Sequence, residues 1–109
     1  MKFNVDQIDK ELGENYWQPT EIVRINDFVI RAMACKGEYY WHSHDEDDEC
    51  LLVMKGQVTL DMPGQSVVLK EGQGFMIPKG VKHKPHCEER AIMFMIEPRE
   101  ITTTKGAPL

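Results

Sequence analysis

The chain has 109 residues, which is enough for one hydrophobic core but not for two. Hydrophobic residues make up 41% of it and charged residues 28%, the proportions of an ordinary soluble globular protein. The formal net charge of −5 argues against a nucleic acid partner, because phosphate binding requires a basic face and none is visible. We therefore expect a single domain over residues 1–109.

Residues 1–20 are expected to form an N-terminal extension that contains one short helical segment. Val5, Ile8 and Leu12 follow the helical spacing of three and four residues, and Gly13 is a typical helix end. The extension has no apolar stretch resembling a signal peptide, and no run in the chain approaches membrane-spanning length. The sequence thus predicts a cytoplasmic protein with no membrane contact.

The cysteines fit the same compartment. Cys35, Cys50 and Cys87 are odd in number and follow neither a disulfide framework nor a CxxC spacing. We expect them to be reduced thiols, as is usual in cytosolic proteins.

From residue 21 onward the sequence predicts short β-strands. Runs rich in Val, Ile, Phe, Tyr and Met alternate with turn signals such as Asn26-Asp27, Lys36-Gly37 and Pro63-Gly64. Short, evenly spaced strands without helices between them indicate an all-β antiparallel barrel or sandwich. The expected strands are 21–25, 28–35, 38–43, 49–55, 57–62, 66–70, 74–77, 81–86 and 91–97.

Two of these strands, around 50–54 and 91–96, are apolar on both faces. One face of an antiparallel sheet commonly meets water, so a strand that is apolar on both sides needs a cover on each. The outer cover could be the N-terminal helix or a second copy of the chain. We predict a homodimer from this pattern.

The segment 39–50, YYWHSHDEDDEC, contains a first candidate metal site. His42 and His44 are two residues apart, so on a strand over 38–43 both imidazoles would share one face, together with Tyr40. Two imidazoles and a carboxylate suit a first-row divalent metal. The acidic run 45–49 offers five carboxylates, of which Glu49 stands out because an apolar strand starts directly after it.

The segment 72–87, GQGFMIPKGVKHKPHC, contains the other two of the four histidines. A glycine turn, a short strand and a Pro-x-Gly turn precede His83, which on its own would be a weak candidate ligand. His86 is three residues further, so on a regular strand it faces the opposite way and is interpreted as a surface residue. The nearby Lys79, Lys82 and Lys84 either are solvated turn residues or attract an anionic ligand to the mouth of the barrel.

Together the two segments resemble the paired motifs of the cupin family. The first motif is similar to Gly37-x4-His42-x-His44-x4-Glu49-x6-Gly56, and the second to Gly72-x5-Pro78-x-Gly80-x2-His83-x3-Cys87. The likeness covers residues 37–87. Outside it, Trp17-x-Pro19, WHSH (41–44) and IEP (96–98) are similar to small single-domain cupins described as mannose-6-phosphate-isomerase-like.

This resemblance implies a double-stranded β-helix, the cupin jelly-roll barrel, with a metal inside it. Carried over position by position, the ligands would be His42, His44, Glu49 and His83. The set has neither the thiolates of a structural zinc site nor the all-oxygen donors that Mg or Ca prefer, so one Mn, Fe, Ni, Co or Zn ion per chain is expected. Cys87 departs from the pattern, because the family usually has Asn there.

The resemblance also implies a small-molecule ligand at the open metal positions. We expect a metal-dependent enzyme acting on a small polar molecule such as a sugar or sugar phosphate, in an isomerase-like reaction. Such a reaction needs a base, and Tyr40 is the only further ionisable group that the alternation places on the metal face. Two alternatives stay open, an Fe(II)-dependent dioxygenase and a non-catalytic module that binds a sugar or metabolite.

Overall fold

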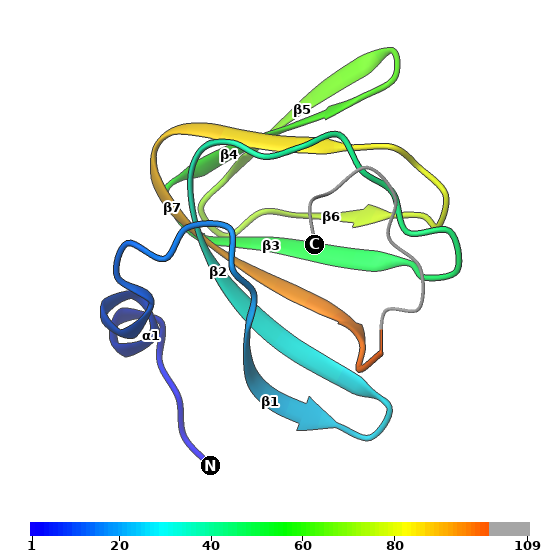
Figure 1. Ribbon diagram of the computed structural model, residues 1–109. Coiled ribbons are helices and arrows are strands. Elements are labelled where there is room, and N and C mark those ends of the chain that lie inside the picture. Colours follow the sequence, from blue (N-terminus) through cyan, green and yellow to red (C-terminus); the bar gives the residue numbers. More distant parts are fainter. Residues whose placement is uncertain (101–109) are drawn as a thin grey trace.

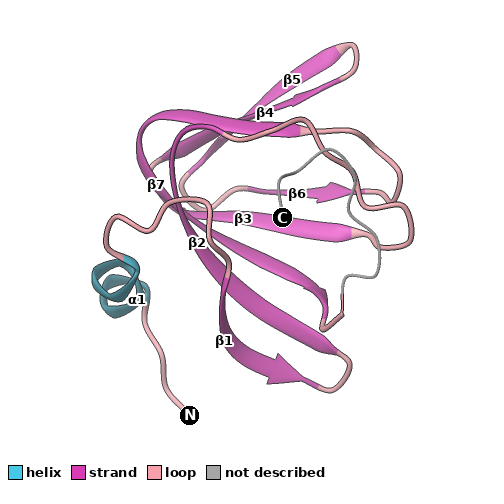
Figure 2. Ribbon diagram, viewed as in Figure 1, coloured by secondary structure: helices cyan, strands magenta, loops and turns pink. Residues whose placement is uncertain are grey.

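The computed structural model describes residues 1–100, so residues 101–109 at the end of the predicted domain lie outside the described part. It is a mostly β structure with one helix beside the sheet (Figure 1 and Figure 2). Within residues 1–100, no helix combines the length and the apolar character needed to cross a membrane.

The single helix, α1 (Val5–Leu12), begins and ends where the sequence predicts. The Asn4 side chain caps its N-terminus by accepting a hydrogen bond of 2.8 Å from the Gln7 N–H. Gly13 ends it with a positive φ of 55°, a conformation that glycine adopts without a Cβ penalty. Ile8 and Leu12 are the buried face, and burying each side chain stabilises the fold by about 1.5–3 kcal/mol.

Seven strands follow, and every pairing between them is antiparallel. The order across the sheet is β1-β2-β7-β3-β6, while β4 pairs with both β5 and β7. The long strand β7 therefore joins the two parts of the fold, and the sheet curls around an interior (Figure 1). The strands are β1 (Thr20–Ile25), β2 (Phe28–Glu38), β3 (Glu49–Lys55), β4 (Gln57–Met62), β5 (Gln65–Lys70), β6 (Gly74–Ile77) and β7 (Lys84–Pro98).

The predicted strands differ from the observed ones in two regions of the chain. The sequence suggests a turn at Lys36-Gly37, but β2 continues to Glu38, because Gly37 takes a φ of 78° at an irregularity in the pairing with β7. The residues expected as a strand over 38–43 then leave the ladder, apart from a bridge at His42. The expected strands 81–86 and 91–97 are one strand, since the charged residues 88–90 lie in the same irregularity.

The sheet has an interior core and a second apolar cluster outside it. Inside, Val53, Val58, Leu60 and Met93 are almost fully buried. Outside, Ile8 and Leu12 of α1 belong to one cluster with Ala32, Ala34, Ile92 and Phe94 of the sheet. The helix therefore covers part of the outer face, as one of the two predicted alternatives requires.

Charged side chains fix α1 against the sheet. Arg90 of β7 donates to the Asp9 carboxylate at 2.6 and 3.0 Å and also to the Asp9 and Gly13 carbonyls. Lys55 at the end of β3 donates to the other Asp9 oxygen at 3.1 Å. Asp9 therefore joins the helix to two strands that are far from it in sequence.

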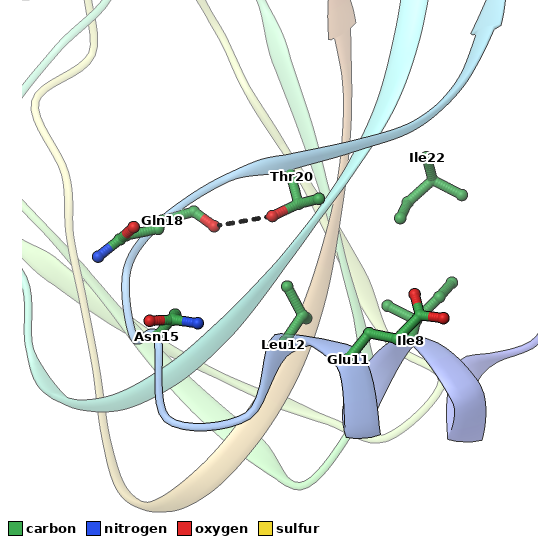
Figure 3. Close-up of a pocket in the computed structure, with 7 residues that line it drawn as sticks. All are labelled: Ile8, Glu11, Leu12, Asn15, Gln18, Thr20 and Ile22. Carbon is green, nitrogen blue, oxygen red and sulfur yellow. Dashed lines mark hydrogen bonds between the residues drawn. The ribbon is translucent and has the colours of Figure 1, made fainter.

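A hollow of about 150 Å³ lies between α1 and the beginning of β1 (Figure 3). Its lining mixes apolar and polar side chains, and none of the candidate metal ligands is among them. The lining residues are Ile8, Glu11, Leu12, Asn15, Gln18, Thr20 and Ile22.

Candidate metal centre

Three of the four histidines come together at one place in the barrel. His42 and His83 form an antiparallel bridge, and their ring centroids are 4.1 Å apart. His44 is next to both, with its ring centroid 5.3 Å from that of His42 and 5.8 Å from that of His83. One ring nitrogen from each histidine lies within 4.8 Å of the other two, which makes the trio a candidate metal-binding group.

The backbone determines which nitrogen two of these rings present. Nδ1 of His42 is 2.8 Å from the Tyr40 carbonyl oxygen, and Nδ1 of His83 is 2.9 Å from that of Val81. A carbonyl can only accept, so each Nδ1 carries the hydrogen and each Nε2 keeps its lone pair. A carbonyl partner on the remote nitrogen is also typical of metal-bound histidine.

The Nε2 atom of His83 is the strongest indication that these residues can bind a metal. Among the described residues it is the buried side-chain nitrogen or oxygen without a hydrogen-bond partner. Burial lowers the pKa of His83 to about 4, and burial also lowers the pKa of His42. Both imidazoles are therefore neutral near pH 7, the form that coordinates a metal.

Glu49 completes the donor set as the first residue of β3. Its side chain is buried, with Oε2 at 3.7 Å from His44 Nε2 and Oε1 at 3.7 Å from His83 Nε2. Burial raises the pKa of Glu49 well above its ordinary value, and the neighbouring Glu97 carboxyl raises it further. A bound cation would compensate the ionised carboxylate there, so the residues fit a divalent metal.

Asp48 is in a different position from its neighbour. It is exposed, and its Oδ1 accepts a hydrogen bond of 2.8 Å from the backbone N–H of Lys79. The Gly80 N–H likewise donates to the His44 carbonyl at 2.8 Å. The turn of the second segment is thereby fixed to the first, and Glu49 points inward as the strand alternation predicts.

The predicted placement of Tyr40 is wrong because the chain is not a strand over 38–43. Tyr40 is 56% exposed and meets Tyr39 edge-on at 5.6 Å. The ring that contacts His42 is Tyr39, at 5.1 Å between centroids, and Trp17 lies against Tyr39 at 5.3 Å. The catalytic role suggested for Tyr40 stays a prediction, and Tyr39 is the tyrosine whose ring contacts His42.

Sequence reasoning missed two residues, Glu97 and Arg31. Glu97 is 5% exposed and pairs with Arg31 at 2.6 Å. Its position could have been found from the alternation on β7, because Met93 and Met95 point into the barrel and the next residue of that row is Glu97. Glu97 directly follows the run 91–96, which is apolar on both faces, so this run does not by itself indicate a polar inward residue.

The remaining candidates lie outside the trio. His86 is half-buried, and its Nε2 is 2.9 Å from Asp61 Oδ2, as expected for a residue on the other face.

Cys87 is buried, and burial raises the pKa of its thiol, although a hydrogen bond with the Gly37 backbone partly offsets the increase. Lys79 and Lys82 are exposed, and Lys84 pairs with Glu38 at 3.4 Å. All three cysteines are free thiols.

Residues 30–97 match the family described as Cupin domain. The uncharacterized protein YdbB of Bacillus subtilis is 31% identical over 83 residues, which cover 75% of this chain and 74% of YdbB. The crystal structure of a cupin-2 domain containing protein from Shewanella frigidimarina is 33% identical, with a TM-score of 0.82 over 88% of this chain and 94% of that chain.

More distant structures share the fold alone. A Klebsiella pneumoniae protein with a double-stranded beta-helix domain is 17% identical, with a TM-score of 0.74 over 99% of this chain and 100% of that chain. Hydroquinone 1,2-dioxygenase from Sphingomonas sp. TTNP3, solved with 4-hydroxybenzoate bound, is also 17% identical. Its TM-score is 0.71, over 79% of this chain and 68% of the dioxygenase.

Proposed function

This chain belongs to the cupin domain family, and from that premise we propose that it binds one divalent transition metal through His42, His44, Glu49 and His83. The observation that carries the proposal is the buried Nε2 of His83, which has no hydrogen-bond partner among the described residues. An unpaired buried nitrogen costs about 1–3 kcal/mol, and coordination would remove that cost.

The donor set points to Mn, Fe, Ni, Co or Zn. Imidazole suits the later metals of this series, and one carboxylate adds a hard donor without making the set all-oxygen. When bound, such an ion supplies a Lewis acid with positions open for oxygen atoms of a ligand. The chain itself supplies neutral imidazoles of fixed tautomer, a buried carboxylate and an apolar interior below them.

We propose that the ligand is a small polar molecule such as a sugar or sugar phosphate, and that the reaction is isomerase-like. A small oxygen-rich molecule suits the open metal positions. Moving a proton on it requires a base, and the candidates are Tyr39, whose ring contacts His42, and Tyr40, whose ring contacts Tyr39. Substituting each tyrosine with Phe separates them, because the base is the one whose loss lowers kcat with little change in KM.

A dioxygenase is the second candidate, suggested by a likeness in fold to one such enzyme. The barrel of hydroquinone 1,2-dioxygenase superimposes on this one at a TM-score of 0.71. An Fe(II) dioxygenase would use the same open positions for substrate and O₂ and would not need a protein base. A non-catalytic module that binds a sugar or metabolite is the third candidate, and it needs only the metal and the barrel.

Elemental analysis of the protein purified without chelators tests the metal proposal. We expect about one transition metal per chain in the wild type and a large loss in His83→Ala. His86→Ala is the matched control, because it removes a histidine three residues away that pairs with Asp61 outside the trio. A wild type that neither retains nor takes up Mn, Fe, Ni, Co or Zn would contradict the proposal.

Substrate screens with the loaded protein then separate the three functions. O₂ consumption with a phenolic substrate supports the dioxygenase, and sugar turnover without O₂ supports the isomerase. Saturable ligand binding with no turnover under either condition leaves the binding module.

A further inference from the structure

A second buried glutamate, Glu97, lies on the strand next to the proposed ligand Glu49. The register of β3 and β7 pairs Cys50 with Ile96, so the next residues, Glu49 and Glu97, stand at the same level on neighbouring strands. Both side chains are buried, at 7% and 5% exposure, and the two carboxyl groups are within hydrogen-bonding reach. Glu97 thus contacts Glu49 from the neighbouring strand.

The other end of Glu97 is held by Arg31 of β2. Nη1 of Arg31 donates to Glu97 Oε1 at 2.6 Å, and Nη2 donates to the Arg99 carbonyl at 2.7 Å. Arg31 is therefore fixed at two points and cannot swing away from Glu97 without losing both bonds. The contacts form a chain from Arg31 through Glu97 to Glu49, and Glu49 in turn lies 3.7 Å from His44 and His83.

Fold stability alone does not account for this arrangement. Acidic residues opposite each other on adjacent strands destabilise a sheet, and a buried carboxylate is costly even when it is paired. The preceding inward residues of β7 are Ala91, Met93 and Met95, so an apolar residue at position 97 would continue the core. The carboxyl group of Glu97 therefore has a role in its interaction with Glu49 and not in the packing of the core.

We propose that Glu97, anchored by Arg31, is a positioning residue that orients the Glu49 carboxylate toward His44 and His83 for metal binding. The proposal rests on the metal-binding function above. A glutamate side chain has several rotamers, and immobilising one before the metal arrives reduces the entropy lost on binding. Partners of metal ligands act in this way in other proteins, and their loss costs affinity.

Two conservative variants separate positioning from charge. Glu97→Gln keeps the length of the side chain; its amide oxygen can accept from Arg31 and its amide nitrogen can donate to Glu49. Glu97→Asp keeps the charge but is one methylene shorter, so it cannot span the distance between Arg31 and Glu49. Asp61→Asn is the control, because it removes one negative charge from an ion pair outside the histidine trio.

The measurement is Co²⁺ affinity by calorimetry on metal-free protein, together with the visible absorption bands of bound Co²⁺. We expect Glu97→Asp to weaken Co²⁺ binding by about 10- to 100-fold and to shift the bands, because Glu49 would bind in an altered position. The Co²⁺ affinities of Glu97→Gln and Asp61→Asn should stay within a few fold of the wild-type affinity. Their absorption bands should match those of the wild type. Thermal unfolding of the metal-free variants shows that each one is folded.

Every other result overturns the inference. Wild-type affinity in Glu97→Asp with a loss in Glu97→Gln would mean that the charge matters and not the reach. Equal losses in both variants, no loss in either, or a Glu97→Asp protein that does not fold would remove the positioning role as well. A wild type that binds no Co²⁺ would overturn the metal proposal and this inference together, whereas binding with the wrong pattern overturns this inference alone.

Discussion

The backbones of His42 and His83 hydrogen-bond to each other in both directions, with the N–H of each donating to the carbonyl of the other at 3.0 and 2.9 Å. This pair joins two segments that are 41 residues apart and places their imidazoles 4.1 Å from each other. The geometry of the candidate metal centre therefore depends on the backbone of the barrel as well as on its side chains.

Replacing His83 with Ala should weaken metal binding by more than the roughly 10- to 100-fold expected for loss of an outer partner, because a direct ligand is removed. His86→Ala should leave the affinity unchanged, since His86 pairs with Asp61 outside the trio. Calorimetric titration of both metal-free variants with Ni²⁺ checks this. Similar losses in the two variants would show that His83 is not a ligand.

In the metal-free protein, the stability that depends on neutral His83 should be lost as the pH falls. Burial holds the pKa of His83 at about 4 in the folded state, against 6.5 for an ordinary histidine. The unfolded chain therefore takes up the proton first. The contribution of neutral His83 to the free energy of unfolding is fully present above pH 6.5. It is lost between pH 6.5 and about 4, in total on the order of 3 kcal/mol.

Urea denaturation of the metal-free protein between pH 7 and pH 4.5 measures this loss. His83→Gln should have a flatter stability profile over the same range, because its side chain does not titrate. Glu49 acts in the opposite sense, since its pKa is raised in the folded state and its protonation there adds stability as the pH falls toward its ordinary pKa. A profile that is equally steep in wild type and His83→Gln would contradict the assignment.

The sequence predicts the strands and the ligand candidates because both follow from local spacing. The helix at Val5–Leu12, the turns other than Lys36-Gly37 and the inward direction of Glu49 depend on neighbouring residues, and they agree with the structure. Tyr40 was misplaced because its orientation depends on where β2 ends. That end is determined by the bulge at Gly37, which pairs with residues on β7 that are distant in the sequence.

The link between Arg31 and Glu97 is missing from the sequence for the same reason. The two residues are 66 positions apart, and only the pairing of β2 with β7 brings them together. Alternation could show that Glu97 faces inward, but no local pattern reveals what it contacts there. Residue spacing therefore predicts candidate ligands more reliably than it predicts the residues that support those ligands.

Glu49→Gln should weaken metal binding by about 10- to 100-fold or more, whereas Asp48→Asn should change it little. Glu49 is buried at 3.7 Å from two histidines, whereas Asp48 is exposed and accepts from the backbone of Lys79. Metal affinities of the two variants, which carry the same change in charge, provide the test. An equal or larger loss in Asp48→Asn would mean that the wrong acid has been assigned.

Asp9→Ala should destabilise the protein by about 2 kcal/mol, because Arg90 would keep its partly buried charge without a carboxylate partner. Asp6→Ala is the control, since Asp6 pairs with Lys55 from a side chain that is 80% exposed, and its loss should change the stability little. Denaturant midpoints measure both effects. Equal destabilisation would mean that the Arg90 contact does not hold the helix.

The homodimer stays a prediction, and the structure indicates where to test it. The helix covers only part of the outer face, while Met76 and Phe28 remain 57% and 52% exposed. Cys50 stands between Met76 on β6 and Ile96 on β7, so an apolar row crosses three strands. A second copy packed on this row would bury about 800 Å² per partner in an interface of standard size.

Met76→Asp should therefore dissociate the dimer at micromolar concentration while leaving the fold intact, because Met76 is exposed and outside both core clusters. Leu52→Asp or Met54→Asp should also dissociate it, but both residues pack against the cluster under α1, so these changes would weaken the fold as well. Val68→Asp is the control, since Val68 is 48% exposed on the separate β4–β5 hairpin. Sedimentation velocity decides the question. A wild type that is monomeric throughout, or a Met76→Asp protein that remains dimeric, would exclude this face and leave α1 as the cover of the sheet.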